Sequence, residues 1–143
     1  MAGADPQGRT GQSTAGATHL IKVACEAALG KRDSLSVFGS DFNTYDGTGV
    51  RDYIHVTDLT DAHYGILSEL RTGNPGVTVN CGYGQGYSVL DVAKVVKEVS
   101  GKDFEVKMID RRPGDVGEVV AGNARITEPV SYTHLTLPTT PYV

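Results

Sequence analysis

The chain has 143 residues, with 17 acidic and 13 basic side chains and a net charge of −4, and its length allows one domain at most. The basic residues are scattered, which argues against a nucleic-acid partner but is compatible with a single bound nucleotide. The longest apolar run, residues 20–29, is interrupted by Lys22 and Glu26, so no membrane span is predicted.

The first elements follow a polar, glycine-rich loop over residues 2–18. This start lacks the apolar stretch of a signal peptide, so we expect a cytoplasmic protein. A helix is predicted for residues 19–29, with Thr18 as its N-cap and Gly30 as a left-handed residue that closes it. A short strand is predicted over residues 36–38.

A loop rich in Gly, Asp, Asn and Thr occupies residues 39–49 and leads to a predicted strand over residues 50–56. Thr57 is predicted to cap the next helix, whose apolar residues recur at helical spacing up to Leu70 before Gly73 ends it.

The second half repeats this alternation of strand and helix. Its predicted elements are a strand over 77–81, a turn over 82–86, a helix over 88–100 with Ser88 and Asp91 as a capping box and Gly101 as its stop, and a strand over 104–109. Strands that alternate with helices indicate an α/β fold with some parallel pairing.

Two cysteines, Cys25 and Cys81, lie in apolar periodic segments. They are predicted to be buried thiols of a protein in a reducing compartment, and not a disulfide or a metal site.

The composition changes at about Pro129, because residues 129–143 contain no Asp, Glu, Lys or Arg and are rich in Thr and Pro. This segment resembles one translated reading frame of a transposase-type sequencing adapter. We therefore expect a non-native tail at residues 129–143, with a native Thr/Pro-rich tail as the alternative.

Two segments place arginine beside glycine and aspartate: Gly47 to Val56, which contains Arg51, and Arg111 to Asp115. The planar guanidinium of arginine binds phosphate oxygens in pairs, and a carboxylate accepts hydrogen bonds from two sugar hydroxyls. The pattern suits a diphosphate joined to a ribose. Either arginine alone is also compatible with a surface ion pair, Arg111 is expected to be a surface or packing residue, and Asp115 is also suited to closing its own turn.

The order of these segments resembles the substrate-binding half of the UDP-glucose 4-epimerases, a family of extended short-chain dehydrogenases. The resemblance lies in Ala2–Ala4, Thr18–Ile21, Ser36–Gly39, Gly47–His63, Tyr87–Val92 and Arg111–Asp115. It implies that residues 1–128 are an incomplete α/β C-terminal part of a Rossmann-type enzyme that binds a UDP-sugar.

The resemblance also assigns nine residues to UDP-sugar binding. Arg51 and Arg112 would hold the pyrophosphate, Asp115 the ribose, and residues 36–38 the uracil. Val119 would face the hexose, where a small side chain admits an N-acetyl group. The full set is His19, Leu20, Ser36, Val37, Phe38, Arg51, Arg112, Asp115 and Val119. Leu20 would pack against the nucleotide, and Phe38 and Val119 are also compatible with packing in the core.

Two motifs are interpreted as false leads. Gly82, Gly84 and Gly86 follow a predicted strand as a dinucleotide-binding turn would, but Tyr87 stands where that motif needs its third glycine. The pair His55 and His63 lacks neighbouring ligands at metal-binding spacing, so structural histidines are expected.

Catalysis in the family implies a glycine-rich NAD turn and a Tyr-x-x-x-Lys pair, and none of the seven tyrosines here is followed four positions later by lysine. The intact enzyme, expected to be a homodimer, would interconvert UDP-glucose and UDP-galactose by NAD-dependent transient oxidation at C4. The fragment alone is expected to be inactive and to bind NAD weakly. The alternatives are a related epimerase of UDP-arabinose, UDP-glucuronate or UDP-N-acetylglucosamine, and a nucleotide-binding module without chemistry.

Overall fold

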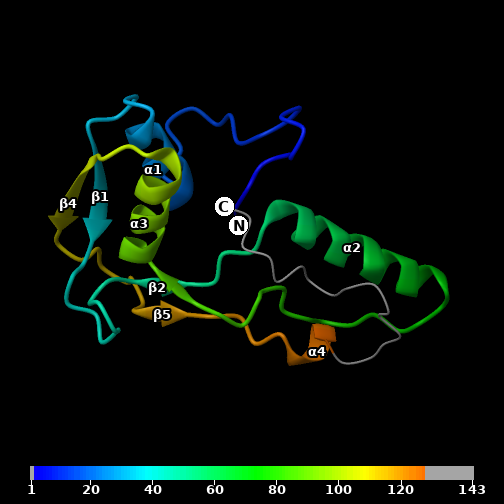
Figure 1. Ribbon diagram of the computed structural model, residues 1–143. Coiled ribbons are helices and arrows are strands. Elements are labelled where there is room, and N and C mark those ends of the chain that lie inside the picture. The colour runs from blue at the N-terminus through cyan, green and yellow to red at the C-terminus, as the bar shows by residue number, and fades with distance from the viewer. Residues whose placement is uncertain (1, 128–143) are drawn as a thin grey trace. The chain divides into compact units, whose positions relative to one another are not determined.

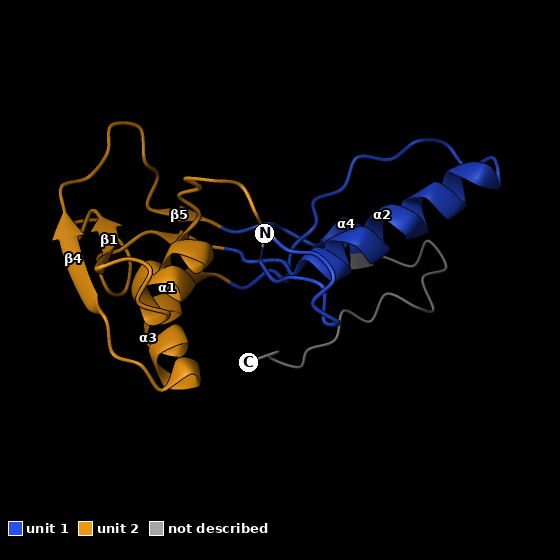
Figure 2. Ribbon diagram, turned by 90° about the horizontal axis from the view of Figure 1, so that it is seen from above, with its two compact units in different colours: residues 1–11, 52–85, 120–142 blue, residues 12–51, 86–119, 143 orange. Residues whose placement is uncertain are grey.

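The computed structural model describes residues 2–127, which form two compact units. Within this range, unit 1 contains residues 2–11, 52–85 and 120–127, and unit 2 contains residues 12–51 and 86–119. Figure 2 shows the two units in separate colours. The expected tail at 129–143 lies outside the described residues.

Unit 2 is built on the parallel pair β1 (Ser34–Phe38) and β4 (Glu105–Ile109), which run in register from Ser34 opposite Glu105 to Phe38 opposite Ile109. Helices α1 (Leu20–Ala28) and α3 (Val89–Ser100) pack beside these strands (Figure 1). The core between them consists of Ala24, Ala27, Leu35, Ala93 and Phe104. The predicted parallel pairing of an α/β unit is therefore confirmed.

A second, shorter sheet in unit 2 has the strand order β3-β2-β5. Its strands are β2 (Val50–Arg51), β3 (Tyr87–Ser88) and β5 (Glu118–Val119). Strand β2 pairs antiparallel with β3 and parallel with β5, and Arg51 lies opposite Val119 in the latter pair. The sheet thus brings the segment that follows Arg111 and Arg112 next to Arg51.

The ends of α3 follow the sequence signals, whereas the start of α1 does not. Ser88 and Asp91 form the predicted capping box, and Gly101 closes α3 in the left-handed region with φ 62°. Gly30 has φ 69° after α1, as expected. The predicted cap Thr18 is wrong, because α1 begins at Leu20 and His19 occupies the N-cap position without a capping side-chain hydrogen bond.

Unit 1 contains α2 (Val56–Arg71) and the short α4 (Ala124–Thr127). The predicted strand over residues 50–56 is wrong beyond Arg51. Ala2 forms a β-bridge with His55, and its carbonyl accepts a hydrogen bond from the Val56 amide at 2.8 Å. Helix α2 begins at this point. His55, not the expected Thr57, is the N-cap, and its Nδ1 accepts from the Thr57 amide at 3.2 Å.

The expected strand over residues 77–81 is also absent from the described structure. No strand of residues 2–127 pairs with this segment. A β-strand needs such a neighbour, because its amides and carbonyls bond across the sheet and not within the strand. The apolar sequence was therefore insufficient evidence for a strand.

The apolar faces predicted for the helices are only partly covered within residues 2–127. Ala62 is buried in α2 and Ala93 in α3, but Leu67, Leu70, Val95 and Val99 are exposed. The prediction of buried cysteines is wrong for Cys25, which is exposed because it lies beside the buried stripe of Ala24 and Ala27 on α1. Cys81 is half-buried. Among the helices described, none has the length and apolar character to cross a membrane.

Candidate functional site

The candidate site lies in unit 2, where the segment 110–117 leaves β4 and passes the ends of β1 and β2. Parallel strands end at the same edge of a sheet, so Phe38 and Ile109 lie opposite each other at that edge. The Gly39 amide donates to the Ile109 carbonyl at 2.8 Å, and the Val50 amide donates to the Gly117 carbonyl at 2.7 Å. Both ends of the segment are therefore fixed by backbone hydrogen bonds.

A tight turn brings three of the predicted residues together. The Asp115 amide donates to the Arg112 carbonyl at 3.2 Å, and Gly114 between them has φ 85°, a value at which Cβ-bearing residues are strained. Nε of Arg112 donates to Oδ2 of Asp115 at 2.8 Å, and the Arg112 guanidinium carbon lies 4.7 Å from the centroid of the Phe38 ring. A cation, a carboxylate and an aromatic ring thus converge.

The pairing fixes Arg112 without using all of its donors. Its side chain is exposed, whereas Asp115 is half-buried. Within residues 2–127 only Nε of Arg112 is engaged in a hydrogen bond or ion pair, so both terminal nitrogens remain able to donate to an anion. Asp115 keeps lone pairs on two oxygens for hydroxyl donors.

Arg51 is held by backbone carbonyls and not by a carboxylate. Its Nη1 donates to the carbonyls of Val50 at 2.7 Å and Gly117 at 3.2 Å, and its Nη2 donates to the Val116 carbonyl at 2.7 Å. A guanidinium has five N–H donors, so these three bonds leave two. No ion pair neutralises Arg51 within the described residues, so its positive charge remains available to an anion.

The other predicted residues lie on the same unit, but in different surroundings. Along β1 the side chains of Leu35 and Val37 are buried, whereas Ser36 is half-buried and Phe38 is 38% exposed. Val37 can therefore reach a ligand only through its backbone. Leu20 packs against the core cluster, and Val119 on β5 is exposed.

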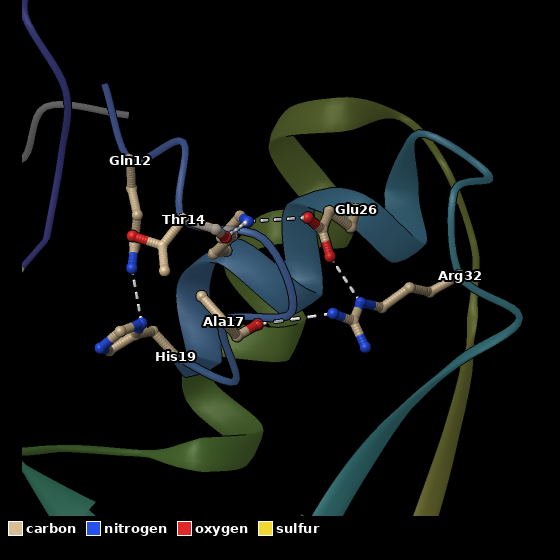
Figure 3. Close-up of polar contacts among 7 residues, drawn as sticks. Gln12, Thr14, Ala17, His19, Glu26 and Arg32 are labelled. Carbon is tan, nitrogen blue, oxygen red and sulfur yellow. Dashed lines mark hydrogen bonds and ion pairs between the residues drawn. The ribbon is translucent and has the colours of Figure 1, made fainter. Parts of the chain in front are cut away.

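His19 has Gln12 as its polar partner, and Figure 3 shows this pair beside a separate group of contacts around Glu26. The amide nitrogen of Gln12 lies 2.6 Å from Nδ1 of His19. Lys22 donates to the Thr14 carbonyl at 2.8 Å and pairs with Glu26, which also pairs with Arg32. No hydrogen bond or ion pair of the described chain joins His19 to Arg112 or Asp115.

Two aromatic residues of the loop 39–49, Phe42 and Tyr45, were not predicted from the sequence as part of the site. Phe42 is buried, and Arg111 stacks on it with its guanidinium carbon 4.3 Å from the ring centroid. Arg111 also pairs with Asp41 at 3.0 Å, so it is a packing residue as expected. The hydroxyl of Tyr45 donates to Asp91 and accepts from the Ser88 amide at 2.9 Å, and the hydrogen bond that it donates to Asp91 raises the pKa of Tyr45. The sequence feature that could have pointed to both residues is the presence of aromatic side chains within a glycine-rich loop.

The turn that begins at Gly82, in unit 1, does not suit a dinucleotide. Asp52 accepts from the amides of Tyr83 at 3.3 Å and Gly84 at 3.2 Å, so its carboxylate occupies the donors that a pyrophosphate would need. A Cβ at Gly82 would lie 2.4 Å from Asp52 Oδ2 and 2.7 Å from Cβ of Ala121, so the close approach at this glycine is to protein. The pyrophosphate of a dinucleotide such as NAD therefore does not fit this turn.

His55 and His63, the pair predicted to be structural histidines, make local hydrogen bonds. Nδ1 of His63 lies 2.7 Å from the Leu59 carbonyl, and Nδ1 of His55 accepts from the Thr57 amide. Over residues 2–127, no group of three or more His, Cys, Asp or Glu side chains is arranged to hold a metal ion.

Comparison with known proteins places this geometry in a family. Residues 5–82 match the NAD dependent epimerase/dehydratase family. The UDP-glucose 4-epimerase of Azospirillum brasilense is 54% identical over 132 residues, which are 92% of this chain and 38% of that protein.

Two solved structures agree with this placement. The UDP-Glc/GlcNAc 4-epimerase from Campylobacter jejuni has a TM-score of 0.68 and 46% identity, with 81% of this chain and 35% of that chain covered. A UDP-glucose 4-epimerase from Bifidobacterium longum in complex with NAD+ and UDP has a TM-score of 0.79 and 35% identity, with 86% of this chain and 37% of that chain covered. The chain spans 38% of the length of the Azospirillum relative. The expected fold class is confirmed: the chain is an incomplete α/β part of a Rossmann-type enzyme.

Proposed function

Because this chain belongs to the NAD-dependent epimerase/dehydratase family, we propose that residues 1–128 are the UDP-sugar-binding C-terminal part of a UDP-glucose 4-epimerase. In the whole enzyme UDP-glucose and UDP-galactose would interconvert by transient oxidation at C4, with bound NAD supplying the hydride chemistry. The residues of this chain hold the nucleotide while that chemistry proceeds elsewhere.

The observation that carries the proposal is the convergence of Phe38, Arg112 and Asp115 at one sheet edge, with Arg51 bound to the same segment. The terminal nitrogens of Arg112, unpaired within residues 2–127, can donate to phosphate oxygens, and Asp115 has acceptors for the two ribose hydroxyls. Arg51 adds a second positive charge, and the backbone of residues 36–38 can read the polar edge of uracil. Together these groups match a ribose with a diphosphate.

A firm hold on UDP suits an epimerase for a physical reason. The oxidised sugar must present its other face before hydride returns, so the hexose has to be held loosely. Binding energy from the part of the substrate that does not react can then position the part that does. The arginines and Asp115 would supply that energy here.

Val119 suggests the sugar scope. It is exposed beside Arg51 in the β2–β5 pair, and valine leaves space for a substituent at C2 of the hexose. We propose that the enzyme accepts UDP-N-acetylglucosamine as well as UDP-glucose, in line with the name of the Campylobacter neighbour.

A second candidate function is a nucleotide-binding module without chemistry, because the sequence contains no Tyr-x-x-x-Lys pair. In either case the partner is a UDP-sugar. For the whole enzyme we propose a homodimer in the cytoplasm. The compartment is supported by the free cysteines Cys25 and Cys81, because unpaired thiols are typical of reducing surroundings.

The test is calorimetric titration of the purified chain with UDP and, separately, with uridine. Arg51→Ala and Arg112→Ala should each weaken UDP binding by roughly 1.5–3 kcal/mol, as for the loss of a charge-assisted hydrogen bond, and leave uridine binding nearly unchanged. Lys107→Ala is the control, since Lys107 lies in unit 2 and pairs with Glu105 on β4. Failure of the wild-type chain to bind UDP, or an equal loss in the control, would refute the proposal.

A further inference from the structure

Phe42 lies at the centre of a closed loop between β1 and β2. Its ring is buried, with 7% of the residue exposed. The Phe42 amide donates to the Gly47 carbonyl at 3.0 Å, and the Thr44 hydroxyl donates to the Thr48 carbonyl at 2.7 Å. These bonds fold the loop back on itself and fix the position from which the ring projects.

The Phe42 ring is enclosed by groups from two segments, the loop 39–49 and the segment 110–117. A Cβ at Gly39 would lie 2.5 Å from the ring, and one at Gly117 would lie 3.4 Å from it, so both backbones run directly against Phe42. Arg111 covers the ring at 4.3 Å, and its Nη2 is fixed by Asp41, through the carboxylate at 3.0 Å and the carbonyl at 3.1 Å. The ring therefore joins the loop to the segment 110–117.

The segment braced by Phe42 also holds Arg51. The Gly117 carbonyl accepts from Nη1 of Arg51 at 3.2 Å and from the Val50 amide at 2.7 Å, and the adjacent Val116 carbonyl accepts from Nη2 at 2.7 Å. The three heavy atoms nearest to a Cβ built at Gly117 all belong to Phe42. A shift of this backbone would displace two of the three acceptors of the Arg51 guanidinium.

We propose that Phe42 is a positioning residue that orients the Arg51 guanidinium by bracing the carbonyls of Val116 and Gly117. It touches no ligand in this role. Its effect on nucleotide affinity rests on the proposed function, but its effect on Arg51 does not, so the two can be tested apart.

Phe104 provides a matched control for Phe42. It is also a buried phenylalanine of unit 2, 8% exposed, and it too lies beside a cation, with Nζ of Lys97 5.1 Å from its ring centroid. It belongs to the core cluster with Leu35 and Ala93. Phe104→Leu therefore removes the same atoms from the same unit away from the carbonyls that hold Arg51.

The experiment measures ¹⁵N relaxation of the Arg51 Nε in the full chain labelled on arginine, with the signal assigned by Arg51→Lys. Phe42→Leu should lower the order parameter of Nε and reduce UDP affinity by roughly three- to tenfold, less than loss of the arginine itself. Phe104→Leu should leave both unchanged. If Phe42→Leu does not fold, Phe42→Met, which has about the same volume as leucine but a more adaptable side chain, should show a change in the same direction.

The outcomes separate the two proposals. An Arg51 that stays ordered in the Phe42 variants overturns the positioning role, as does an equal loss of order in Phe104→Leu, which would indicate general loosening of unit 2. If no form of the chain binds UDP, the proposed function fails, while the relaxation data still decide whether Phe42 orients Arg51.

Discussion

Ser88→Ala is expected to destabilise unit 2 by about 1–2 kcal/mol, the upper half of the range for losing a serine N-cap. The magnitude follows from burial. Ser88 is fully buried, its hydroxyl accepts from the Asp91 amide at 2.9 Å, and Asp91 accepts from the Ser88 amide at 3.0 Å. After the substitution the Asp91 amide loses its acceptor at a helix end to which water has little access, so the cost exceeds that of an exposed cap.

The assay is equilibrium unfolding in urea, followed by far-ultraviolet circular dichroism at low protein concentration. Ser100→Ala, at the other end of α3, is the control, because Ser100 is exposed and its hydroxyl makes two long hydrogen bonds, donating to the Lys97 carbonyl at 3.4 Å and accepting from the Lys102 amide at 3.2 Å. It should change the free energy of unfolding by less than about 0.5 kcal/mol. Equal effects of the two substitutions would refute the argument that burial sets the cost.

The same substitution should spare ligand affinity in the folded protein. Ser88 lies opposite Val50 in the β2–β3 pair, and that pairing uses backbone groups that alanine retains. UDP affinity should therefore stay within about twofold of wild type. A large loss of affinity would show that the cap also shapes the site around Arg51.

Three further outcomes are expected. Hydrogen bonds from Arg32, the larger cause, and from Lys22 lower the pKa of Glu26 in the folded protein. The ionised Glu26 side chain therefore stabilises the fold at pH values above its pKa in the unfolded chain, and this stabilisation is lost as the pH falls through its pKa in the folded protein. Urea unfolding should find Glu26→Gln less stable than wild type near neutral pH and equal to it in acid. Val119→Tyr should weaken binding of UDP-N-acetylglucosamine and spare UDP-glucose by calorimetry, and equal losses would make Val119 a packing residue. The chain alone should show neither tight NAD binding nor epimerase activity in a coupled assay free of host enzyme.

Helix α3 could be predicted to its termini because its signals are local. The Ser88 hydroxyl and the Asp91 carboxylate cap each other's amides, and Gly101 readily adopts the left-handed conformation that ends the helix. At α2 the capping rule named Thr57 and failed. There the backbone of Ala2 pairs with residues 54–56 and so sets where the helix begins, which places His55 at the N-cap.

Strands were harder to predict because pairing is not local. The segments over residues 50–56 and 77–81 have similar apolar character, yet only Val50 and Arg51 form a strand, since β3 and β5 lie on either side of them. The register that sets Val119 opposite Arg51 likewise joins positions distant in sequence. Composition indicates that a segment can be extended, but only the fold determines whether a neighbour is present.

The residues of the candidate site likewise fall into those that could be predicted from local sequence and those that could not. Arg51, Arg112 and Asp115 could be proposed from the sequence because their charged side chains suit phosphate and sugar hydroxyl groups. The glycine and proline residues beside them indicate turns. Phe42 could not be named, because the loop that contains it also contains Tyr45, and nothing local distinguishes the two aromatic residues. Phe42 is 7% exposed and Tyr45 68%, a difference that arises because the Phe42 ring meets Gly117 and Arg111 from a distant part of the chain. A group that would contact the ligand is thus visible in sequence, whereas the residue proposed to orient it becomes visible only when the chain is folded.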